Sequence, residues 1–289
     1  MKAQRDILAE FSDTKRKIKE RMSRIKHKIA IISGKGGVGK TTISANLAFG
    51  LALRGYKVGI IDADIYSPDI PIALGILDKK PRGSKEGIIP ITGKYGIKVI
   101  SVQYFLDSLD EPIIWSGPMV AKAIIQFLRD VIWEDLDFLI IDLPPGTGDE
   151  VLTVFQFLRP LSGVLIVTTG QKIALSDVAK AIKMCKKLKV PILGIVENMS
   201  YFKCPHCGKI IKIFGKEDVS KIANENNIKL LAKIPITPEI SRYTDMGIPL
   251  VDGNDPISKL FNEIIEKILT KLNVPLSNKM SQKYRNIRK

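Results

Sequence analysis

The sequence predicts an α/β fold in which a mostly parallel central sheet is flanked by helices. Short, continuous apolar runs alternate with stretches whose apolar residues recur at helical spacing, and no long polar break interrupts this alternation. The 289 residues, 45% of them hydrophobic, are enough for one large core. We expect the strands near residues 28–33, 57–61, 97–102, 138–142, 163–168, 192–197 and 229–234.

Charge and apolar spacing divide the chain into three parts. Residues 1–27 form a basic segment with the apolar spacing of a helix, residues 28–274 form the main domain, and residues 275–289 form a basic tail that we expect to be disordered. Within the domain, residues 79–96 are rich in Gly, Pro and Lys and should form an inserted loop or hairpin. Residues 257–272 have the pattern of an amphipathic helix that docks on the core.

A phosphate-binding loop follows the first expected strand. The chain there matches GxxxxGK[ST], with a strand before the glycines and a helix after them. Such glycines let successive backbone N–H groups point at phosphates, and the helix start adds the positive end of its dipole. Lys40 would reach the β and γ phosphate oxygens, and the Thr41 hydroxyl would complete a magnesium shell. The expected nucleotide-binding residues are Gly34, Lys35, Gly36, Gly37, Val38, Gly39, Lys40, Thr41 and Thr42.

Carboxylates follow two further expected strands. Asp142 ends the apolar run 138–142, the usual place for a carboxylate that holds magnesium directly or through water. Residues 143–149 form a stiff turn after it that could sense the γ-phosphate. Asp62 and Asp64 follow another apolar run, and we choose Asp64 to orient the attacking water. Spacing alone does not decide between these two acids.

The cysteines are few, and two of them are close in sequence. Three cysteines are too few for a disulfide framework and no secretory signal precedes them, so we expect a reducing, cytoplasmic location. Cys204 and Cys207 form a Cys-x-x-Cys pair in an expected hairpin near residues 200–214. Soft tetrahedral sites prefer four sulfurs, so one chain supplies half a site and a twofold-related copy would complete it. Cys185 is expected to be a small buried residue.

Spacing leaves other interpretations of the cysteine pair open. Cys-Pro-x-Cys-Gly is also the sequence motif of a zinc knuckle, and a zinc site that bridges two chains would have the same sequence pattern. A redox dithiol is less favoured, because such pairs usually open a helix directly after a strand. His206 lies between the cysteines and is expected to be a solvated turn residue rather than a ligand.

Together these motifs resemble a known family. Lys35 directly after the first glycine, the Asp62 to Asp64 segment and residues 142–149 resemble the MinD, ParA and Mrp branch of the P-loop ATPases, the deviant Walker A group. Residues 197–208, which contain the cysteine pair, are similar to the Mrp/ApbC iron-sulfur cluster carriers, also called the Nbp type. The resemblance covers about residues 28–272, and the cysteine segment is its most specific part.

The resemblance implies roles that the residues alone do not establish. Lys35, otherwise a solvated loop cation, would cross a homodimer interface to the nucleotide of the partner protomer. Cys204 and Cys207 of two protomers would hold a bridging 4Fe-4S cluster destined for apoproteins. Asn198 follows the strand 192–197 at the carboxyl edge of the sheet, where its amide could pair with adenine as the related ATPases suggest.

The net charge of +15 lies mostly at the two ends of the chain. Residues 1–28 carry a net charge of +6 and residues 275–289 carry +5, which leaves only +4 between them. Solvated ends are the simplest interpretation, and contact with nucleic acid, an anionic membrane or an acidic client is less favoured. No apolar run approaches the roughly 18 residues that a membrane-spanning helix needs.

The sequence therefore predicts a homodimeric, slow ATPase, with ATP, Mg²⁺ and a shared 4Fe-4S cluster as its cofactors, that delivers the cluster to apoproteins. Catalysis would fall to Lys35, Lys40, Asp64 and Asp142. The alternative is a ParA- or MinD-like positioning ATPase that binds DNA or membrane, with cysteines that hold zinc or nothing. A small-molecule kinase is less favoured still, because no acceptor pocket can be identified.

Overall fold

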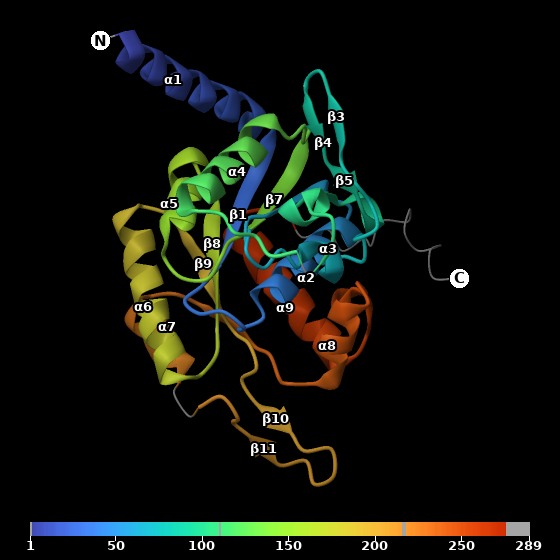
Figure 1. The fold of residues 1–289 in the computed structure, drawn as a ribbon. Coiled ribbons are helices and arrows are strands. Elements are labelled where there is room, and N and C mark those ends of the chain that lie inside the picture. The colour runs from blue at the N-terminus through green and yellow to red at the C-terminus, as the bar shows by residue number, and fades with distance from the viewer. Residues whose placement is uncertain (1, 110, 216–217, 276–289) are drawn as a thin grey trace.

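The computed structural model describes residues 2–109, 111–215 and 218–275, and its centre is an eight-stranded sheet (Figure 1). Every neighbouring pair of strands is parallel except one at the edge. The strands, in sheet order, are β12 (Leu230–Lys233), β9 (Ile192–Glu197), β8 (Gly163–Thr168), β1 (Ile25–Ser33), β7 (Leu136–Asp142), β2 (Val58–Asp62), β6 (Lys98–Ile100) and β5 (Ile91–Thr92). This architecture confirms the predicted fold class, and seven of these strands lie where the sequence predicts them.

Both faces of the sheet are covered, which explains why its strands are continuously apolar. Along β1, Ile29 and Ile31 belong to one buried cluster, whereas Ala30 and Ile32 belong to the other. Successive side chains of a strand point to opposite faces, so a strand buried on both sides has no polar positions to alternate with.

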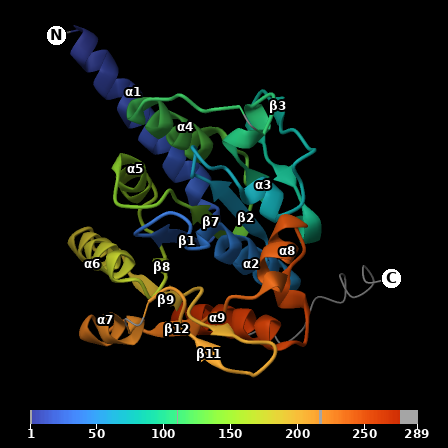
Figure 2. The ribbon, with the colours of Figure 1, turned by 60° about the horizontal axis from the view of Figure 1, so that its bottom comes forward.

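Each face is covered by its own set of helices (Figures 1 and 2). The first cluster is completed by helices α2 (Lys40–Leu53), α3 (Ile70–Ala73), α8 (Pro238–Asp245) and α9 (Pro256–Lys271), and by the 3₁₀ turns η1 (Lys94–Gly96) and η3 (Leu250–Asp252). The second is completed by α1 (Lys2–Ser23), α4 (Gly117–Asp130), α5 (Asp149–Phe157), α6 (Lys172–Lys187) and α7 (Val219–Glu225), and by the 3₁₀ turn η2 (Val102–Phe105).

The end of helix α1 is part of the folded body. Ile18 and Met22 are buried, and β1 begins at Ile25, three residues before the expected start of the first strand. The Nζ atom of Lys28 donates to the carbonyl oxygens of Met22 and Ile25, at 3.2 and 3.1 Å. These bonds satisfy a buried ammonium with backbone groups at the end of α1. Residues 276–289, nearly all of the expected tail, lie outside the described residues.

Two hairpins extend from the sheet. The stretch 79–96 contains β3 (Arg82–Ser84) paired with β4 (Gly87–Ile89), and its end supplies β5, the antiparallel edge strand that the sequence analysis did not predict. The second hairpin, β10 (Phe202–Lys203) with β11 (Ile210–Ile211), contains the cysteine pair and projects from the body (Figure 1). Among the residues described, no helix is both long enough and apolar enough to cross a bilayer.

Candidate functional site

The glycine-rich loop lies between β1 and α2, at the carboxyl end of the sheet. Gly37 and Gly39 have φ of 74° and 81°, values in the left-handed region that favours glycine. A Cβ atom on Gly39 would lie only 2.2 Å from Nδ2 of Asn198. That nitrogen donates to the carbonyl oxygen of Val38 at 2.9 Å, so the residue that follows β9 is hydrogen-bonded to the loop.

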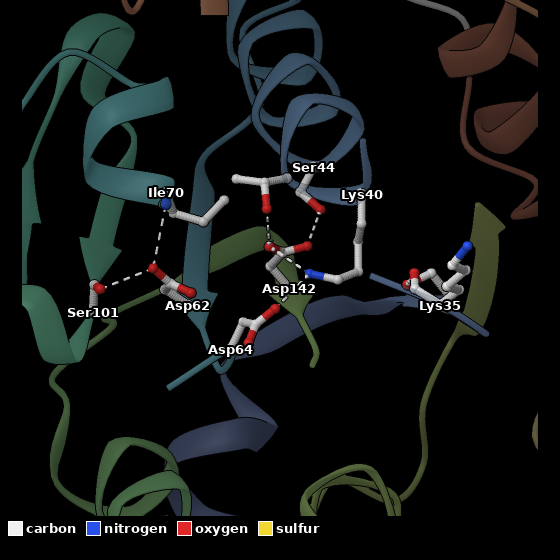
Figure 3. A network of polar contacts seen from close by, with 10 residues as sticks. Lys35, Lys40, Ser44, Asp62, Asp64, Ile70, Ser101 and Asp142 are labelled. Atoms are coloured by element: carbon white, nitrogen blue, oxygen red, sulfur yellow. Dashed lines mark hydrogen bonds and ion pairs between the residues drawn. The ribbon is translucent and has the colours of Figure 1, made fainter. Parts of the chain in front are cut away.

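A buried network of ion pairs joins this loop to β7 and β2 (Figure 3). Nζ of Lys40 lies 3.0 Å from Oδ2 of Asp142 and 3.4 Å from Oδ2 of Asp64. The Thr41 hydroxyl donates to the same Asp142 oxygen at 3.0 Å, and the Ser44 hydroxyl donates to Oδ1 at 2.6 Å. Burial lowers the pKa of Lys40, but the two carboxylates outweigh burial and the pKa is raised, so the side chain stays charged.

Asp62 and Asp64 have different environments although they are two residues apart. Asp62 is fully buried, and its Oδ2 accepts from the Ser101 hydroxyl at 2.8 Å and from the backbone N–H of Ile70 at 3.3 Å. Burial, and then the charge of Asp142, raises the pKa of Asp62 well above its usual value. Its Oδ1 has no hydrogen-bond partner among the described residues. Asp62 therefore joins the start of α3 to the end of β6, whereas Asp64 faces Lys40.

An open cleft of about 760 Å³ lies over the glycine-rich loop. Of the residues singled out from the sequence for this site, Lys35 to Thr42 and Asp64 line the cleft, whereas Gly34, Asn198 and Asp142 are not among its lining residues. Asn198 is 4% exposed. The remaining lining residues are Ser33, Tyr66, Ser67, Asp69, Ile72, Ala73, Pro144, Pro145, Glu150, Met199, Thr244 and Asp245. Loops after β2, β7 and β9 and the end of α8 thus form the walls.

Lys35 is set apart from the carboxylates of this network. Its side chain is exposed, and Nζ donates to Oε1 of Gln171 at 3.3 Å (Figure 3). The two lysines of the loop therefore have different surroundings, because Lys40 is buried between acids and Lys35 lies at the rim of the cleft.

The cysteine pair occupies the turn of the β10–β11 hairpin. Cys207 is exposed and Cys204 is half-buried, and Gly208 completes the turn with φ of 70°. Backbone N–H groups of Cys207 and His206 lower the pKa of the Cys204 thiol, which favours the thiolate that binds metals. Within the described ranges no three His, Cys, Asp or Glu side chains are grouped so that they could hold a metal ion. Cys185 is buried, as expected, and burial raises its pKa to about 11.

The base of this hairpin is hydrogen-bonded to the segment that follows β12. The N–H of Ser200 donates to the carbonyl of Ile234 at 2.8 Å, and the N–H of Ile236 donates to the carbonyl of Tyr201 at 2.7 Å. Residues 198–202 therefore run from the glycine-rich loop, which Asn198 contacts, to the cysteine turn. One short, hydrogen-bonded segment therefore joins the glycine-rich loop to the cysteine turn.

Comparison with known proteins agrees with this geometry. Residues 24–269 match the ParA family model, described as NUBPL iron-transfer P-loop NTPase. The chain belongs to this family. An iron-sulfur cluster carrier protein of Methanocaldococcus jannaschii is 48% identical to this P-loop NTPase over 256 residues, 89% of this chain and 88% of the relative.

Two solved structures share the fold of this NTPase. The nucleotide-binding protein of Archaeoglobus fulgidus in complex with ADP is 43% identical, with a TM-score of 0.70 over 81% of this chain and 91% of that chain. The cell division ATPase MinD of Pyrococcus furiosus shares the fold at 24% identity and a TM-score of 0.60, over 84% of this chain and 98% of that one.

Several residues of the site do not emerge from the sequence analysis of this NTPase. Ser44 lies three residues after Thr41 on α2, and this helical spacing could have placed both hydroxyls at Asp142. Thr244 and Asp245 reach the cleft from a helix about 200 residues along the chain. No local pattern reports such a contact.

Proposed function

We propose that this NTPase hydrolyses ATP and carries a 4Fe-4S cluster, which two copies hold between them on Cys204 and Cys207 before it passes to apoproteins. The observation that carries the proposal is the exposed cysteine turn, which a short segment joins to Asn198, the residue that is hydrogen-bonded to the glycine-rich loop. The family match and the named relative support the iron-sulfur cargo.

The cleft has the groups that ATP hydrolysis needs. The Thr41 and Asp142 oxygens lie 3.0 Å apart, so both can reach a single ion, and Mg²⁺ prefers such oxygen ligands. Bound there, Mg²⁺ would neutralise phosphate charge. Lys40 would exchange its carboxylate contacts for phosphate oxygens, because its charge is retained. Asp64 would orient the water that attacks the γ-phosphorus, and the products are ADP and inorganic phosphate.

Two copies are part of the proposal because each chain supplies only two thiolates. Four cysteine sulfurs are the usual ligand set of a 4Fe-4S cluster, and the described residues offer no third ligand beside Cys204 and Cys207. A twofold axis through the cysteine turns would complete the set. Lys35, at the exposed rim of the cleft, would then reach the nucleotide of the other copy.

The segment between the two sites gives ATP a route to the cargo. Asn198 contacts the glycine-rich loop, and the next six residues lead to Cys204 through the backbone bonds of Ser200 and Tyr201. A change in the loop between ATP and ADP would therefore displace the base of the cysteine hairpin. Nucleotide hydrolysis would act as a switch for the cluster site. Pairing of Asn198 with adenine stays a prediction, since its amide nitrogen is engaged by Val38 here.

The test is iron and acid-labile sulfide analysis of protein prepared without oxygen. We expect about two irons and two sulfides per chain, and their loss in the variant Cys204→Ala/Cys207→Ala. Cys185→Ala is the matched control, because it removes a buried thiol that lies on α6, outside the cysteine turn, and should keep the full metal content. Zinc at about half an atom per chain, or no metal after reconstitution, would refute the cargo and favour a positioning ATPase.

A further inference from the structure

The cysteine hairpin has an unusual surface around its thiols. Residues 202–215 include three lysines and no aspartate or glutamate. Lys203, Lys209 and Lys212 are all exposed, and the ion pairs found among the described residues include none of them.

The same hairpin exposes three large apolar side chains. Ile210, Ile211 and Ile213 are 63%, 44% and 53% exposed, which is unusual for isoleucine in three of four successive positions. The hairpin projects from the body (Figure 1), and the exposed fractions show that no other element of the described chain covers these side chains. Large apolar side chains exposed together on one hairpin mark a binding surface rather than a solvated turn, and the lysines among them favour an acidic partner.

A protein that receives the cluster must contact the surface around the cysteines. A cluster moves between proteins by ligand exchange: each iron–sulfur bond to Cys204 or Cys207 breaks as a bond to a recipient thiolate forms. The proton that the recipient thiol loses passes to the released cysteine, and no electron changes hands. Because the recipient cysteines must come within bonding distance of the cluster, the recipient necessarily touches the surface around Cys207.

We propose that the hairpin, residues 202–215, is the docking surface for recipient apoproteins, and that it selects those whose cluster-ligand cysteines lie in an acidic surface with an apolar centre. This inference rests on the proposed function. Three lysines without an acid match carboxylates by charge, and the isoleucines supply the contact that excludes water. Two copies that share the cluster meet at the cysteines themselves, and the like charges of the lysines keep those side chains apart, so they stay available to a recipient.

The test compares two charge-reversed variants of the full chain. In the first, Lys203→Glu, Lys209→Glu and Lys212→Glu change the hairpin. In the second, the matched control, the same substitution is made at three exposed lysines of α6 and the loop before β12, which are Lys183, Lys187 and Lys229. Both variants and the parent are loaded and analysed for iron and sulfide. The rate of transfer to an apo-ferredoxin rich in Asp and Glu is then measured at low and high salt.

We expect all three proteins to hold the same amount of cluster. The hairpin variant should transfer it about ten-fold or more slowly at low salt, and the difference should narrow at about 0.5 M salt, where charges are screened. The control should stay within about two-fold of the parent, because charges far from the interface change association little. Ile211→Ser should slow transfer at both salt concentrations, since an apolar contact is not screened by ions.

Each other result contradicts the inference in a recognisable way. Equal rates for parent and hairpin variant would mean that the lysines do not meet the recipient. Loss of cluster from the hairpin variant alone would mean that they serve the cargo instead, and equal slowing of the control would mean a general charge effect. If the parent bound no cluster, the metal analysis would show it before any transfer was measured, and this result would refute the proposed function itself.

Discussion

Exchange of Asp62, the last residue of β2, or of Asp64, two residues later, for asparagine separates a structural role from a catalytic one. Asp64 lines the cleft, 3.4 Å from Lys40, whereas Asp62 is fully buried behind it. We expect Asp64→Asn to lower ATP turnover by about 10²- to 10⁴-fold, the usual contribution of a positioned base, with nucleotide binding retained. Asp62→Asn should leave turnover within a few-fold of the parent.

The hydrogen bonds of Asp62 give the size of its contribution to stability. Asparagine keeps an acceptor oxygen for the Ser101 hydroxyl and the Ile70 N–H. At the lowest pH at which the protein stays folded, the free energy of unfolding should therefore change by less than about 1 kcal/mol. Alanine leaves both donors buried and unpaired, and at about 1 to 3 kcal/mol for each such group the cost should be about 2 to 6 kcal/mol.

The contribution of Asp62 to the free energy of unfolding depends on pH in a definite direction. Burial raises the pKa of Asp62 well above 3.8, so its neutral carboxyl stabilises the fold fully below that pH and loses the contribution as pH rises through the folded-state pKa. Relative to Asp62→Asn, which does not titrate, the parent should lose up to about 1.4 kcal/mol per pH unit within that window.

The assay is urea denaturation of parent, Asp62→Asn and Asp62→Ala across a pH series without nucleotide, followed by steady-state ATP hydrolysis. Asp64→Asn serves as the reciprocal control, because it should fail in hydrolysis and not in folding. Loss of hydrolysis in Asp62→Asn with normal turnover in Asp64→Asn would reverse the two roles. A constant free-energy difference between parent and Asp62→Asn across the pH series would refute the raised pKa.

Three further substitutions test the surroundings of the loop. Lys35→Ala should reduce ATP turnover per chain without reducing nucleotide binding by isolated chains, and unchanged turnover in a concentration series would rule out its action across a dimer. Asn198→Ala should cost about 1 to 3 kcal/mol in the free energy of unfolding, because the Val38 carbonyl loses a buried donor, and denaturation would show this. Gly39→Ala should abolish ADP binding in calorimetry, because its Cβ would meet Asn198 and its φ is positive.

Most of the sheet could be predicted because burial on both faces leaves a clear pattern. The expected run 163–168 coincides with β8, and 192–197 coincides with β9. Strand β5 has two residues, too few for any pattern, and its pairing with β6 depends on contacts that sequence spacing does not report. The first strand was placed too late because Lys26 and His27 interrupt its apolar run, although both lie within β1.

The site could be predicted where its residues are local in sequence. The glycine-rich loop is contiguous, and its neighbours Lys40 and Thr41 meet Asp142, the acid that the sequence places at the end of β7. The choice between Asp62 and Asp64 needs the position of Ser101, about 40 residues away, which fixes one of the two acids behind the cleft. Contacts of this kind come from packing rather than from any local pattern.

Native mass spectrometry of the protein prepared without oxygen tests the central claim, that one cluster is held by the cysteine turns of two copies. We predict a species with the mass of two 32.1 kDa chains and one 4Fe-4S cluster, and none of it in Cys204→Ala/Cys207→Ala. A cluster carried by a single chain, or a dimer of the same mass with one zinc ion in place of the cluster, would contradict the claim.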